Sequence, residues 1–544
     1  MATHLPRMAL SAPERTALVV TSSRRHGRAV YSSLTFAGLE ALSNRYANGL
    51  SSIGVGRGMR TLVMVRPGFE FIGVIFALFK MGAVPVLIDP GMGPRRLLEC
   101  IRHVDVQAFV GIPLAHLLRL GRPSAFRGVG PAVTVGRRWC WSGRTLDAVA
   151  RRAADSFVPV NTDTSETAAI LFTSGSTGPA KGVVYEHGMF DAQVRLIQSH
   201  FGIQPGEVDL PAFPLFALFG PAMGMTSVIP DMDPSKPAAV DPAKIVEAIR
   251  DHEVTNTFGS PAIWTRVARH CGERGIKLPS LKRILIAGAP VPYPVIEKLL
   301  TLLADDAEVY TPYGATESLP VSSIGGRELL GECRQRTRKG AGTCVGRTVP
   351  GLDARFIRIT DDPIGEWSDE LLLPDGEIGE IAVAGPVVTR QYYGLPAATA
   401  QAKIREGSRI WHRLGDVGYR GGDGRIWFCG RKTHRVATEH GTIFPVPCEA
   451  IFNEHAEVYR SALVGVGPRG AQRPVIVVEP EGDRFPRGGR VAAFRSELLA
   501  LGRANELTRR IDTVLFHRSF PVDVRHNVKI DREALAVWAA RKLR

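Results

Sequence analysis

The most informative segment of the chain reads Thr173-Ser-Gly-Ser-Thr-Gly-Pro-Ala-Lys-Gly182, and it directly follows the apolar run 168–172. Its glycines, serines and threonines offer backbone N–H groups and hydroxyls that can surround phosphate oxygens, and Lys181 adds a positive charge. The spacing fits neither the G-x-x-x-x-G-K-[ST] pattern of P-loop NTPases nor the G-x-S-x-G elbow of serine hydrolases. A flexible Ser/Gly linker is the alternative, but linkers rarely lie between an apolar strand and a second strand such as 182–185. The segment therefore predicts a phosphate-binding loop.

Helical and strand-like patterns alternate on both sides of this loop, from about residue 33 to residue 390. A helical pattern over 36–50 precedes the apolar run 61–65, and another over 71–80 leads into the apolar run 82–89. This rhythm predicts an α/β fold with mostly parallel sheets, whose ligands bind at the loops that follow the strands. Further buried strands are predicted at 168–172, 283–287 and 380–384.

The chain is too long, at 544 residues, for one compact core. With 44% hydrophobic and 22% charged residues it has the composition of a globular protein. The sequence becomes polar and basic near Gly430, so we predict a large N-terminal domain over 1–429 and a small, mobile C-terminal α/β domain over 430–544. The formal net charge is +15, without long runs of like charge or a nucleic-acid motif. We therefore expect an anionic small ligand and no nucleic acid.

The cysteines and the N-terminus bear on the cellular compartment, and one uncharged stretch bears on contact with a membrane. The seven cysteines are scattered without metal-ligand spacing, and the N-terminus lacks a signal-peptide core, so we expect reduced thiols in a cytoplasmic protein. The stretch 210–230 carries no charge and contains four prolines, so it cannot form a regular transmembrane helix. We expect it to form a buried, loop-rich wall of a pocket for an apolar substrate; a surface that touches a membrane is the alternative.

A second motif, Tyr313-Gly-Ala-Thr-Glu317, completes a pattern with the phosphate loop. Together they resemble the adenylate-forming superfamily of acyl-CoA synthetases, nonribosomal peptide adenylation domains and luciferases, although that family usually has Pro where this chain has Ala180. The resemblance implies that Tyr313 and Gly314 contact adenine, that Thr316 contacts the α-phosphate and that Glu317 binds Mg²⁺, which is a cation that prefers oxygen ligands. It implies that ATP is bound by the loop residues Thr173 (also a metal ligand), Ser174, Gly175, Ser176, Thr177, Gly178 and Lys181.

Other segments match the same family. The turn Ala287-Gly-Ala-Pro290 implies that Gly288, Ala289 and Pro290 lie along the adenine. Asp416 in Trp411-His-Arg-Leu-Gly-Asp416 matches the residue that binds the ribose hydroxyls.

The C-terminal matches concern a hinge and a mobile lysine. In Gly430-Arg-Lys-Thr433, Arg431 matches a nucleotide contact, and Thr433 stands where many relatives carry Asp or Lys as the pivot. Lys529 matches the catalytic lysine that a domain swing moves into and out of the site. His187 matches a histidine near the acyl channel, although a helix-capping or surface histidine fits its position equally well.

The reaction that this resemblance implies is the attack of a carboxylate on the α-phosphorus of ATP. Two anions approach each other, so Mg²⁺, Lys181 and Lys529 are expected to neutralise the repulsion. Finer similarity implies the acceptor, because segments 228–234, 340–346, 428–436 and 520–529 resemble the β-lactone synthetases of bacterial long-chain olefin biosynthesis.

In those enzymes the 3-hydroxyl of a 2-alkyl-3-hydroxy fatty acid attacks its own adenylate, and the enzyme is expected to assemble with other enzymes of the pathway. For such a substrate, 210–230 and 258–262 are the expected walls of the alkyl pocket. A fatty acyl-CoA ligase and a non-catalytic nucleotide-binding protein are the alternatives.

Overall fold

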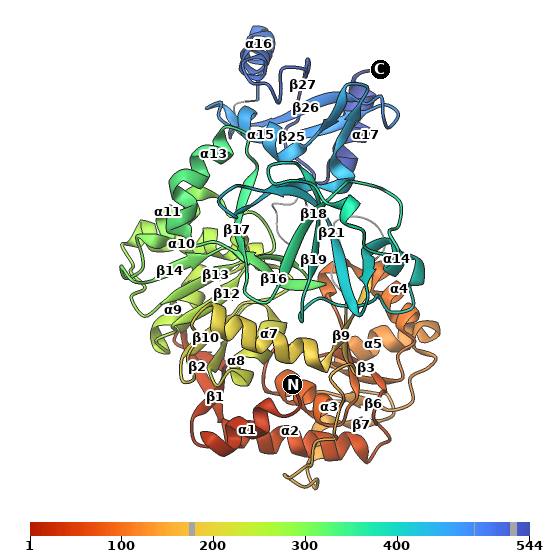
Figure 1. The fold of residues 1–544 in the computed structure, drawn as a ribbon. Coiled ribbons are helices and arrows are strands. Elements are labelled where there is room, and N and C mark those ends of the chain that lie inside the picture. The colour runs from red at the N-terminus through yellow and green to blue at the C-terminus, as the bar shows by residue number, and fades with distance from the viewer. Residues whose placement is uncertain (173–179, 483–484, 523–529) are drawn as a thin grey trace.

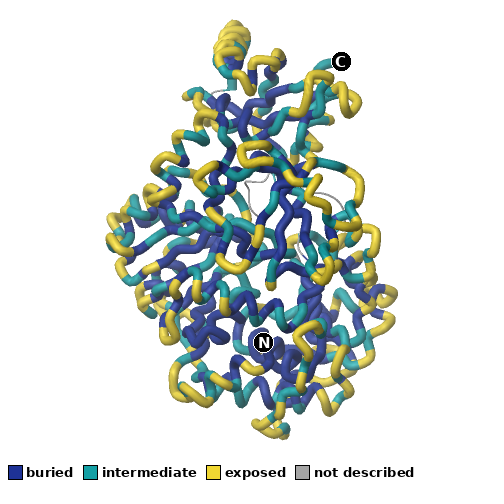
Figure 2. The backbone as a smooth tube through the Cα atoms, in the orientation of Figure 1, coloured by how far each residue is buried: buried dark blue, intermediate teal, exposed yellow. Residues whose placement is uncertain are grey.

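The described residues form two sheets with mainly parallel strands, one antiparallel sheet, a two-stranded sheet of β23 (Val436–Thr438) and β24 (Gly441–Ile443), and a small C-terminal sheet (Figure 1). The computed structural model describes residues 1–172, 180–482, 485–522 and 530–544. In Figure 2 the buried segments lie mainly in the interior, along the strands, and the exposed ones lie at loops and outer helices. The predicted α/β class is confirmed by this arrangement.

The first sheet has its strands in the order β14-β13-β12-β10-β11-β1-β2, and neighbours are parallel except for β1 and β2. Its strands are β14 (Glu308–Tyr310), β13 (Arg283–Ile286), β12 (Asn256–Gly259), β10 (Val208–Pro211), β11 (Thr226–Ile229), β1 (Thr16–Arg25) and β2 (Arg28–Thr35).

The second sheet has the order β7-β6-β5-β3-β4-β8-β9, and neighbours are parallel except for β8 and β9. Its strands are β7 (Arg144–Thr145), β6 (Ala132–Thr134), β5 (Ala108–Gly111), β3 (Arg60–Met64), β4 (Val84–Ile88), β8 (Thr167–Phe172) and β9 (Gly182–Glu186). The predicted phosphate loop therefore connects two strands of this sheet, β8 and β9.

The predicted helices 36–50 and 71–80 form as α2 (Phe36–Ser51) and α3 (Phe69–Lys80). The Thr35 hydroxyl accepts a hydrogen bond from the Gly38 amide and caps α2. A side chain at Gly73 of α3 would clash with the Tyr46 ring of α2, so the close approach of these helices requires glycine. The other longer helices around these sheets are α1 (His4–Ser11), α4 (Pro94–Val104), α5 (Pro113–Gly121), α7 (His187–His200), α9 (Pro242–Asp251), α10 (Pro261–Arg274) and α11 (Tyr293–Leu300).

The third sheet is antiparallel throughout its described pairs, which the sequence did not predict. The predicted strand 380–384 forms as β19, and its six residues are all buried. A strand buried on both faces has a continuous apolar pattern whether its neighbours are parallel or antiparallel, so the pattern could not reveal the direction of pairing. The strands are β15 (Tyr313–Ala315), β16 (Ser318–Ser323), β17 (Thr343–Thr348), β22 (Ile426–Arg431), β21 (Arg409–Arg420), β19 (Gly379–Ala384) and β18 (Asp353–Ile357), with β20 (Lys403–Glu406) paired to β21.

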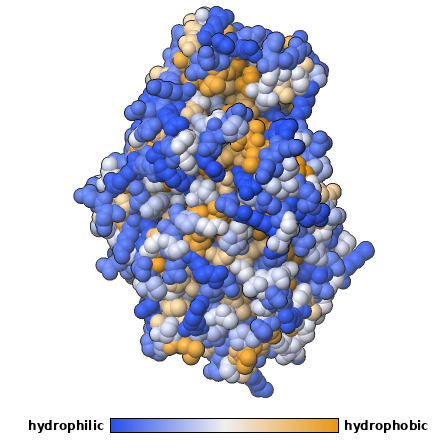
Figure 3. Space-filling model, viewed as in Figure 1, coloured by the Kyte–Doolittle hydropathy of each residue, from blue (hydrophilic) through white to orange (hydrophobic). Residues whose placement is uncertain are grey.

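The C-terminal residues form a sheet of their own, at the top of Figure 1. Its strands β25 (Val458–Val466), β26 (Arg473–Pro480) and β27 (Thr513–Phe516) are accompanied by α15 (Pro445–Phe452), α16 (Gly489–Arg503) and α17 (Arg532–Lys542). Apolar side chains cluster on both faces of this sheet. The face drawn in Figure 3 is mostly hydrophilic, with small apolar patches in its upper part, its middle and its lower end. The predicted division between residues 429 and 430 falls within β22 and stays a prediction.

Candidate active site

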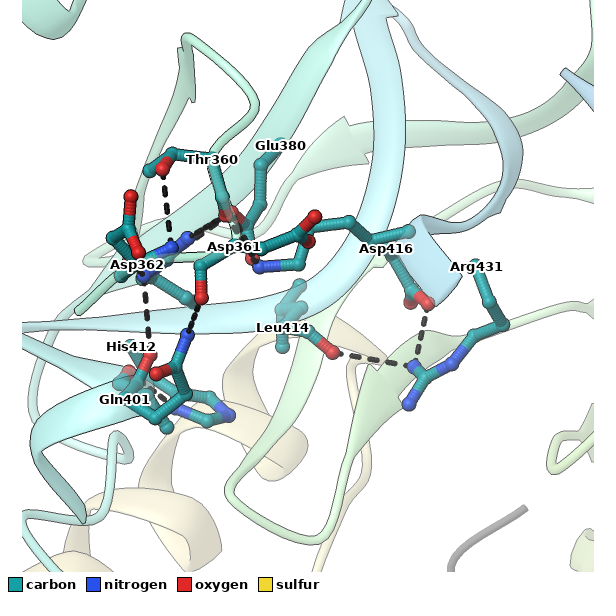
Figure 4. A network of polar contacts seen from close by, with 12 residues as sticks. Thr360, Asp361, Asp362, Glu380, Gln401, His412, Leu414, Asp416 and Arg431 are labelled. Atoms are coloured by element: carbon teal, nitrogen blue, oxygen red, sulfur yellow. Dashed lines mark hydrogen bonds and ion pairs between the residues drawn. The ribbon is translucent and has the colours of Figure 1, made fainter. Parts of the chain in front are cut away.

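One group of predicted residues gathers around Asp416 on β21. The Tyr313 hydroxyl donates a hydrogen bond to Asp416 Oδ2 at 2.6 Å. Arg431 Nη1 donates to Asp416 Oδ1 at 2.5 Å and to the Leu414 carbonyl at 3.2 Å (Figure 4). The pairing of β21 with β22 sets Asp416 opposite Arg431, so sheet register builds this contact.

The electrostatics of this group pair the Asp416 carboxylate with the Arg431 guanidinium. The neighbouring Asp416 carboxylate raises the pKa of Arg431, and burial followed by the Asp416 charge raises the pKa of Tyr313 well above its usual value. A carboxylate has about four acceptor positions, of which Tyr313 and Arg431 occupy two. The remaining lone pairs suit the two hydroxyls of a vicinal diol such as ribose.

A second group gathers around Glu317. The Tyr392 hydroxyl donates to Glu317 Oε1 at 2.6 Å, and Lys181 Nζ lies 4.8 Å from the centre of the Tyr392 ring. Tyr185 donates its hydroxyl to the Thr316 carbonyl at 2.5 Å, which fixes the backbone just before Glu317. The structure thus brings Lys181 and Glu317 to the same Tyr392 side chain, and their predicted roles in phosphate and metal binding stay predictions. Tyr392 and Tyr185 were not predicted from the sequence, because neither stands in a recognised motif.

Two buried basic residues, Lys403 and His412, also lie at this site and were not predicted. The pairing of β20 with β21 sets them opposite each other. Lys403 Nζ donates to the carbonyl and the hydroxyl of Thr389 and lies 6.0 Å from the centre of the Tyr392 ring. Burial lowers the pKa of Lys403 to about 7, against the opposing effect of Glu317. The sequence offered one signal for Lys403, which is a lysine at the first position of a strand whose partner strand is largely buried.

The charge around His412 shows how basic residues converge here. Burial lowers the pKa of His412 well below its usual value, and the positive charges of Lys403, Lys181 and Arg431 lower it further. The ring therefore stays neutral at neutral pH, with Nδ1 3.2 Å from the Ala402 carbonyl. A site that gathers two lysines and an arginine around two carboxylates is suited to a polyphosphate with a bound cation.

The predicted hinge is tied to the third sheet by ion pairs, part of which Figure 4 shows. Lys432 Nζ lies 3.0 Å from Glu380 Oε1, and Arg413 Nη2 lies 2.7 Å from Glu380 Oε2. Arg435 Nη2 lies 2.7 Å from Asp361 Oδ2. Thr433, the predicted pivot position, is exposed between these anchored residues. The ion pairs hold the start of the C-terminal part in the orientation seen here.

The predicted adenine turn follows β13. Gly288 is exposed and has φ of +96°, a conformation that favours glycine, so its backbone is accessible at this turn. Ala289 and Pro290 continue the turn before α11 begins. No hydrogen bond found among the described residues joins Gly288 to Tyr313, so their shared contact with adenine stays a prediction.

His187 lies apart from these groups, as the first residue of α7. It is 4% exposed, its ring faces Phe79 edge-on at 6.1 Å, and neither ring nitrogen has a hydrogen-bond partner among the described residues. Burial lowers its pKa to about 4, so the ring is neutral at neutral pH. Its catalytic role therefore stays a prediction. The predicted residues Thr173, Ser174, Gly175, Ser176, Thr177, Gly178 and Lys529 lie outside the described residues.

A narrow cavity of about 30 Å³ lies beside the Tyr313–Glu317 loop. That volume is roughly the share of one water molecule in the liquid, so the cavity does not hold an alkyl chain without movement of its walls. The rings of Phe216 and Phe258 stack with their centres 3.7 Å apart in its lining. Its other lining residues are Ile197, Phe201, Ile203, Asp209, Phe219, Met223, Asn256, Leu285, Pro312, Leu319 and Pro320.

The predicted walls 210–230 and 258–262 both contribute to this lining. The stretch 210–230 is largely buried and contains short elements, among them η3 (Pro214–Leu218) and α8 (Phe219–Ala222), where mainly loop was expected. Pro214 begins η3 and Pro221 lies within α8, and because proline lacks a backbone N–H the chain forms short turns in place of one long helix.

One polar pair lies in the lining of this apolar cavity. Asn256 Nδ2 donates to Asp209 Oδ1 at 2.7 Å, because β10 and β12 set the two residues side by side. Burial raises the pKa of Asp209 to about 7. Asn256 Oδ1 is buried without a partner among the described residues, so it can accept a hydrogen bond from a group in the cavity.

Comparison with known proteins identifies the family of this chain. The sequence pattern of the family described as "AMP-binding enzyme" matches residues 5–393. The chain is 48% identical over 556 residues to the olefin beta-lactone synthetase of Stenotrophomonas maltophilia (strain K279a), covering 100% of this chain and 98% of that protein. It is 49% identical to the olefin beta-lactone synthetase of Xanthomonas campestris pv. campestris, with the same coverage.

The fold is shared with solved structures of lower identity. A crystal structure of ATP-bound MatB from Rhodopseudomonas palustris matches with a TM-score of 0.78 at 20% identity, over 100% of each chain. The chain therefore belongs to the AMP-binding enzyme family.

Proposed function

We propose that this chain is an ATP-dependent olefin β-lactone synthetase. The observation that carries the proposal is the 48–49% identity, over the full length, to two olefin beta-lactone synthetases. The substrate is a 2-alkyl-3-hydroxy fatty acid, which is first converted to an acyl-adenylate with release of pyrophosphate. Its own 3-hydroxyl oxygen then attacks the acyl carbon, AMP leaves, and the hydroxyl proton is lost as the four-membered ring closes.

Nucleoside binding is assigned to the Asp416 group. Asp416 accepts hydrogen bonds from the ribose hydroxyls while Arg431 neutralises its charge and Tyr313 fixes its second oxygen. The Tyr313 ring and the Gly288–Pro290 turn supply surfaces for adenine. MatB, a protein of the same fold, has been solved with ATP bound, which supports a nucleotide as the ligand of this fold.

Phosphate binding is assigned to the Glu317 group. Thr316 is proposed to contact the α-phosphate and Lys181 to bind the triphosphate, and the loop residues 173–178 belong to the same proposal. The described residues contain no cluster of three or more His, Cys, Asp or Glu side chains that would form a metal cage. The single carboxylate of Glu317 fits Mg²⁺, because Mg²⁺ is commonly bound through one or two carboxylates together with substrate phosphates and water.

The bound cation would lower the charge repulsion between the carboxylate and the triphosphate. Glu317 is suited to hold it, since no side-chain cation lies within ion-pair distance of its carboxylate among the described residues. Lys529 is proposed as the lysine that neutralises charge during adenylation, brought in by movement of the C-terminal part about residues 430–433.

Acid binding is assigned to the cavity beside this group. Its aromatic and aliphatic lining suits alkyl chains, and the Phe216–Phe258 stack must open to admit them. A synthetase of this kind receives its hydroxy acid from a reductive step and passes its lactone to a decarboxylating one, so assembly with such enzymes is part of the proposal.

A CoA-free assay tests the proposed function. The protein is incubated with ATP, Mg²⁺ and a 2-alkyl-3-hydroxy fatty acid without any thiol, and products are identified by mass. We expect the β-lactone, AMP and pyrophosphate in equal amounts. The matched 2-alkyl acid without the 3-hydroxyl should release pyrophosphate on adenylation but give no lactone.

Two outcomes contradict the proposal. Turnover of the hydroxy acid only after CoA is added would identify a fatty acyl-CoA ligase. Failure of every carboxylic acid to stimulate pyrophosphate release would identify a nucleotide-binding protein without this chemistry.

A further inference from the structure

Helix α5 presents an apolar face to solvent. Leu114, Leu117 and Leu120 are 67%, 41% and 49% exposed. At about 100° per residue these positions span an arc of about 120° on the helix surface, and Pro113 and Gly121 fall on the same arc. Every residue of the outward face is therefore apolar, which is unusual for a surface helix of a globular protein.

Trp139 extends this face beyond the helix. Its side chain is 52% exposed, and its ring centre lies 5.7 Å from that of Trp141. Trp141 in turn stacks on the buried His116 of α5, with ring centres 5.1 Å apart and planes 7° apart. The stack fixes the loop that carries Trp139 beside the helix. We call Leu114, Leu117, Leu120 and Trp139 the α5 patch.

The surroundings of the α5 patch are strongly basic. Residues 113–144 contain six arginines and no acidic residue, so this short stretch carries +6 of the formal net charge of +15. All but one of these arginines are exposed: Arg122, Arg127, Arg137, Arg138 and Arg144.

We propose that the α5 patch docks the protein on the surface of an anionic lipid bilayer. Exposed leucines and a tryptophan in a stretch rich in exposed arginines are typical of an interfacial segment, in which apolar side chains enter the bilayer and cations meet lipid headgroups. The nine residues of α5 span about 13.5 Å, which is too short to cross a membrane, so the helix lies in the plane of the surface. None of the described helices is long and apolar enough to span a bilayer.

The position of α5 and the proposed substrate support this occupant. Helix α5 packs against β5 and the short helix η2 (Pro123–Phe126), on the side of the molecule that holds the second sheet (Figure 1). The inference rests on the proposed function in one respect, since an acid with two alkyl chains partitions into membranes and is met most often at their surface. An acidic protein is the main competing occupant, since a second copy of this chain would bring two basic surfaces together, and the experiment separates both from lipid.

Vesicle sedimentation tests the proposal with the full chain. We expect binding to vesicles of phosphatidylcholine mixed with phosphatidylglycerol, much weaker binding to pure phosphatidylcholine, and a decrease with added salt. The double variant Leu117→Ser/Leu120→Ser should bind at least tenfold more weakly. The matched control Leu10→Ser, at an 86% exposed leucine on α1, should bind like the parent.

A second variant separates charge from apolar contact. Arg137→Glu/Arg144→Glu leaves the leucines in place and should reduce binding to anionic vesicles without lowering the thermal stability. Equal sedimentation of the parent and the leucine variant would overturn the proposal. So would sedimentation velocity that shows a parent dimer and a monomeric leucine variant, because the patch would then join two copies.

The docking proposal is also overturned if the correctly folded parent does not bind anionic vesicles. It is overturned as well if the patch binds another enzyme of the pathway in place of lipid. Lactone formation from dispersed acid is measured on the same preparation. A chain that forms lactone but ignores vesicles contradicts only the docking surface, and a chain that binds vesicles but forms no lactone contradicts only the proposed function.

Discussion

Two tyrosine–carboxylate pairs at the site resemble each other in geometry and differ in charge. Tyr313 donates to Asp416 and Tyr392 donates to Glu317, each at 2.6 Å. Asp416 also holds Arg431 at 2.5 Å, whereas Lys181 lies over the Tyr392 ring and makes no ion pair with Glu317 within 4.0 Å.

This difference indicates different ligands for the two carboxylates: Asp416 is suited to a neutral group of the nucleotide, and Glu317 is suited to an exchangeable cation. The Arg431 charge already neutralises Asp416, so that carboxylate is suited to accept hydrogen bonds from neutral hydroxyls. Glu317 is oriented by a neutral phenol and has no fixed counter-ion among the described residues, so its charge is available to Mg²⁺ carried by the nucleotide. Three substitutions test this distinction.

The largest effect is expected from Glu317→Gln. The amide can still accept the hydrogen bond from Tyr392, so only the charge is lost. We expect adenylation to fall about 100- to 1,000-fold, the range for removing one group that stabilises transition-state charge. The measurement is pyrophosphate release over a series of Mg²⁺ concentrations. A variant that regains the parent rate at moderate Mg²⁺ would show that Glu317 is not a metal ligand.

A smaller effect, on a different parameter, is expected from Asp416→Asn. Hydrogen bonds to charged groups contribute about 1.5–3 kcal/mol, so the KM for ATP should rise about 10- to 100-fold. The parent should prefer ATP to 2′-deoxy-ATP, and the variant should lose most of that preference. Thermal unfolding of the variant is the control, because Arg431 is left without its partner. Unchanged discrimination between the two nucleotides would contradict the ribose assignment.

The smallest effect is expected from Tyr392→Phe. The ring near Lys181 is kept, but Glu317 loses the donor that orients it. Ordering a free side chain costs about 0.5–1.5 kcal/mol, so the Mg²⁺ concentration for half-maximal rate should rise about 2- to 10-fold with little change in the maximal rate. Tyr393→Phe, at the adjacent tyrosine, is the matched control. If both variants keep the parent Mg²⁺ dependence, Tyr392 does not position Glu317.

Much of the fold and part of the site could be predicted from local patterns. The strands β3, β4, β8 and β13 and the helices α2 and α3 lie where the apolar runs and helical periodicity predicted them. The predicted contacts of Tyr313, Asp416 and Arg431 with one nucleotide agree with their meeting in the structure.

Other parts of the site depend on contacts between distant residues. Tyr392 is 75 residues from Glu317, and Tyr185 is 131 residues from Thr316, so no short motif contains either pair. Lys403 meets His412 only through the register of β20 and β21, and a shift of one residue would turn one of them to the other face. The exposure of the α5 leucines could not be predicted from the sequence either, because leucines at helical spacing are equally typical of a buried helix face.

The amino-acid sequence alone determined which segments become helices and strands, which loop can surround phosphates and which family the chain resembles, because those properties depend on neighbouring residues along the chain. Only the tertiary structure decided that the third sheet is antiparallel, that a phenol holds Glu317 while a guanidinium holds Asp416, and that the α5 leucines face water. These features depend on strand pairing and on the packing of distant segments, which the local sequence does not specify.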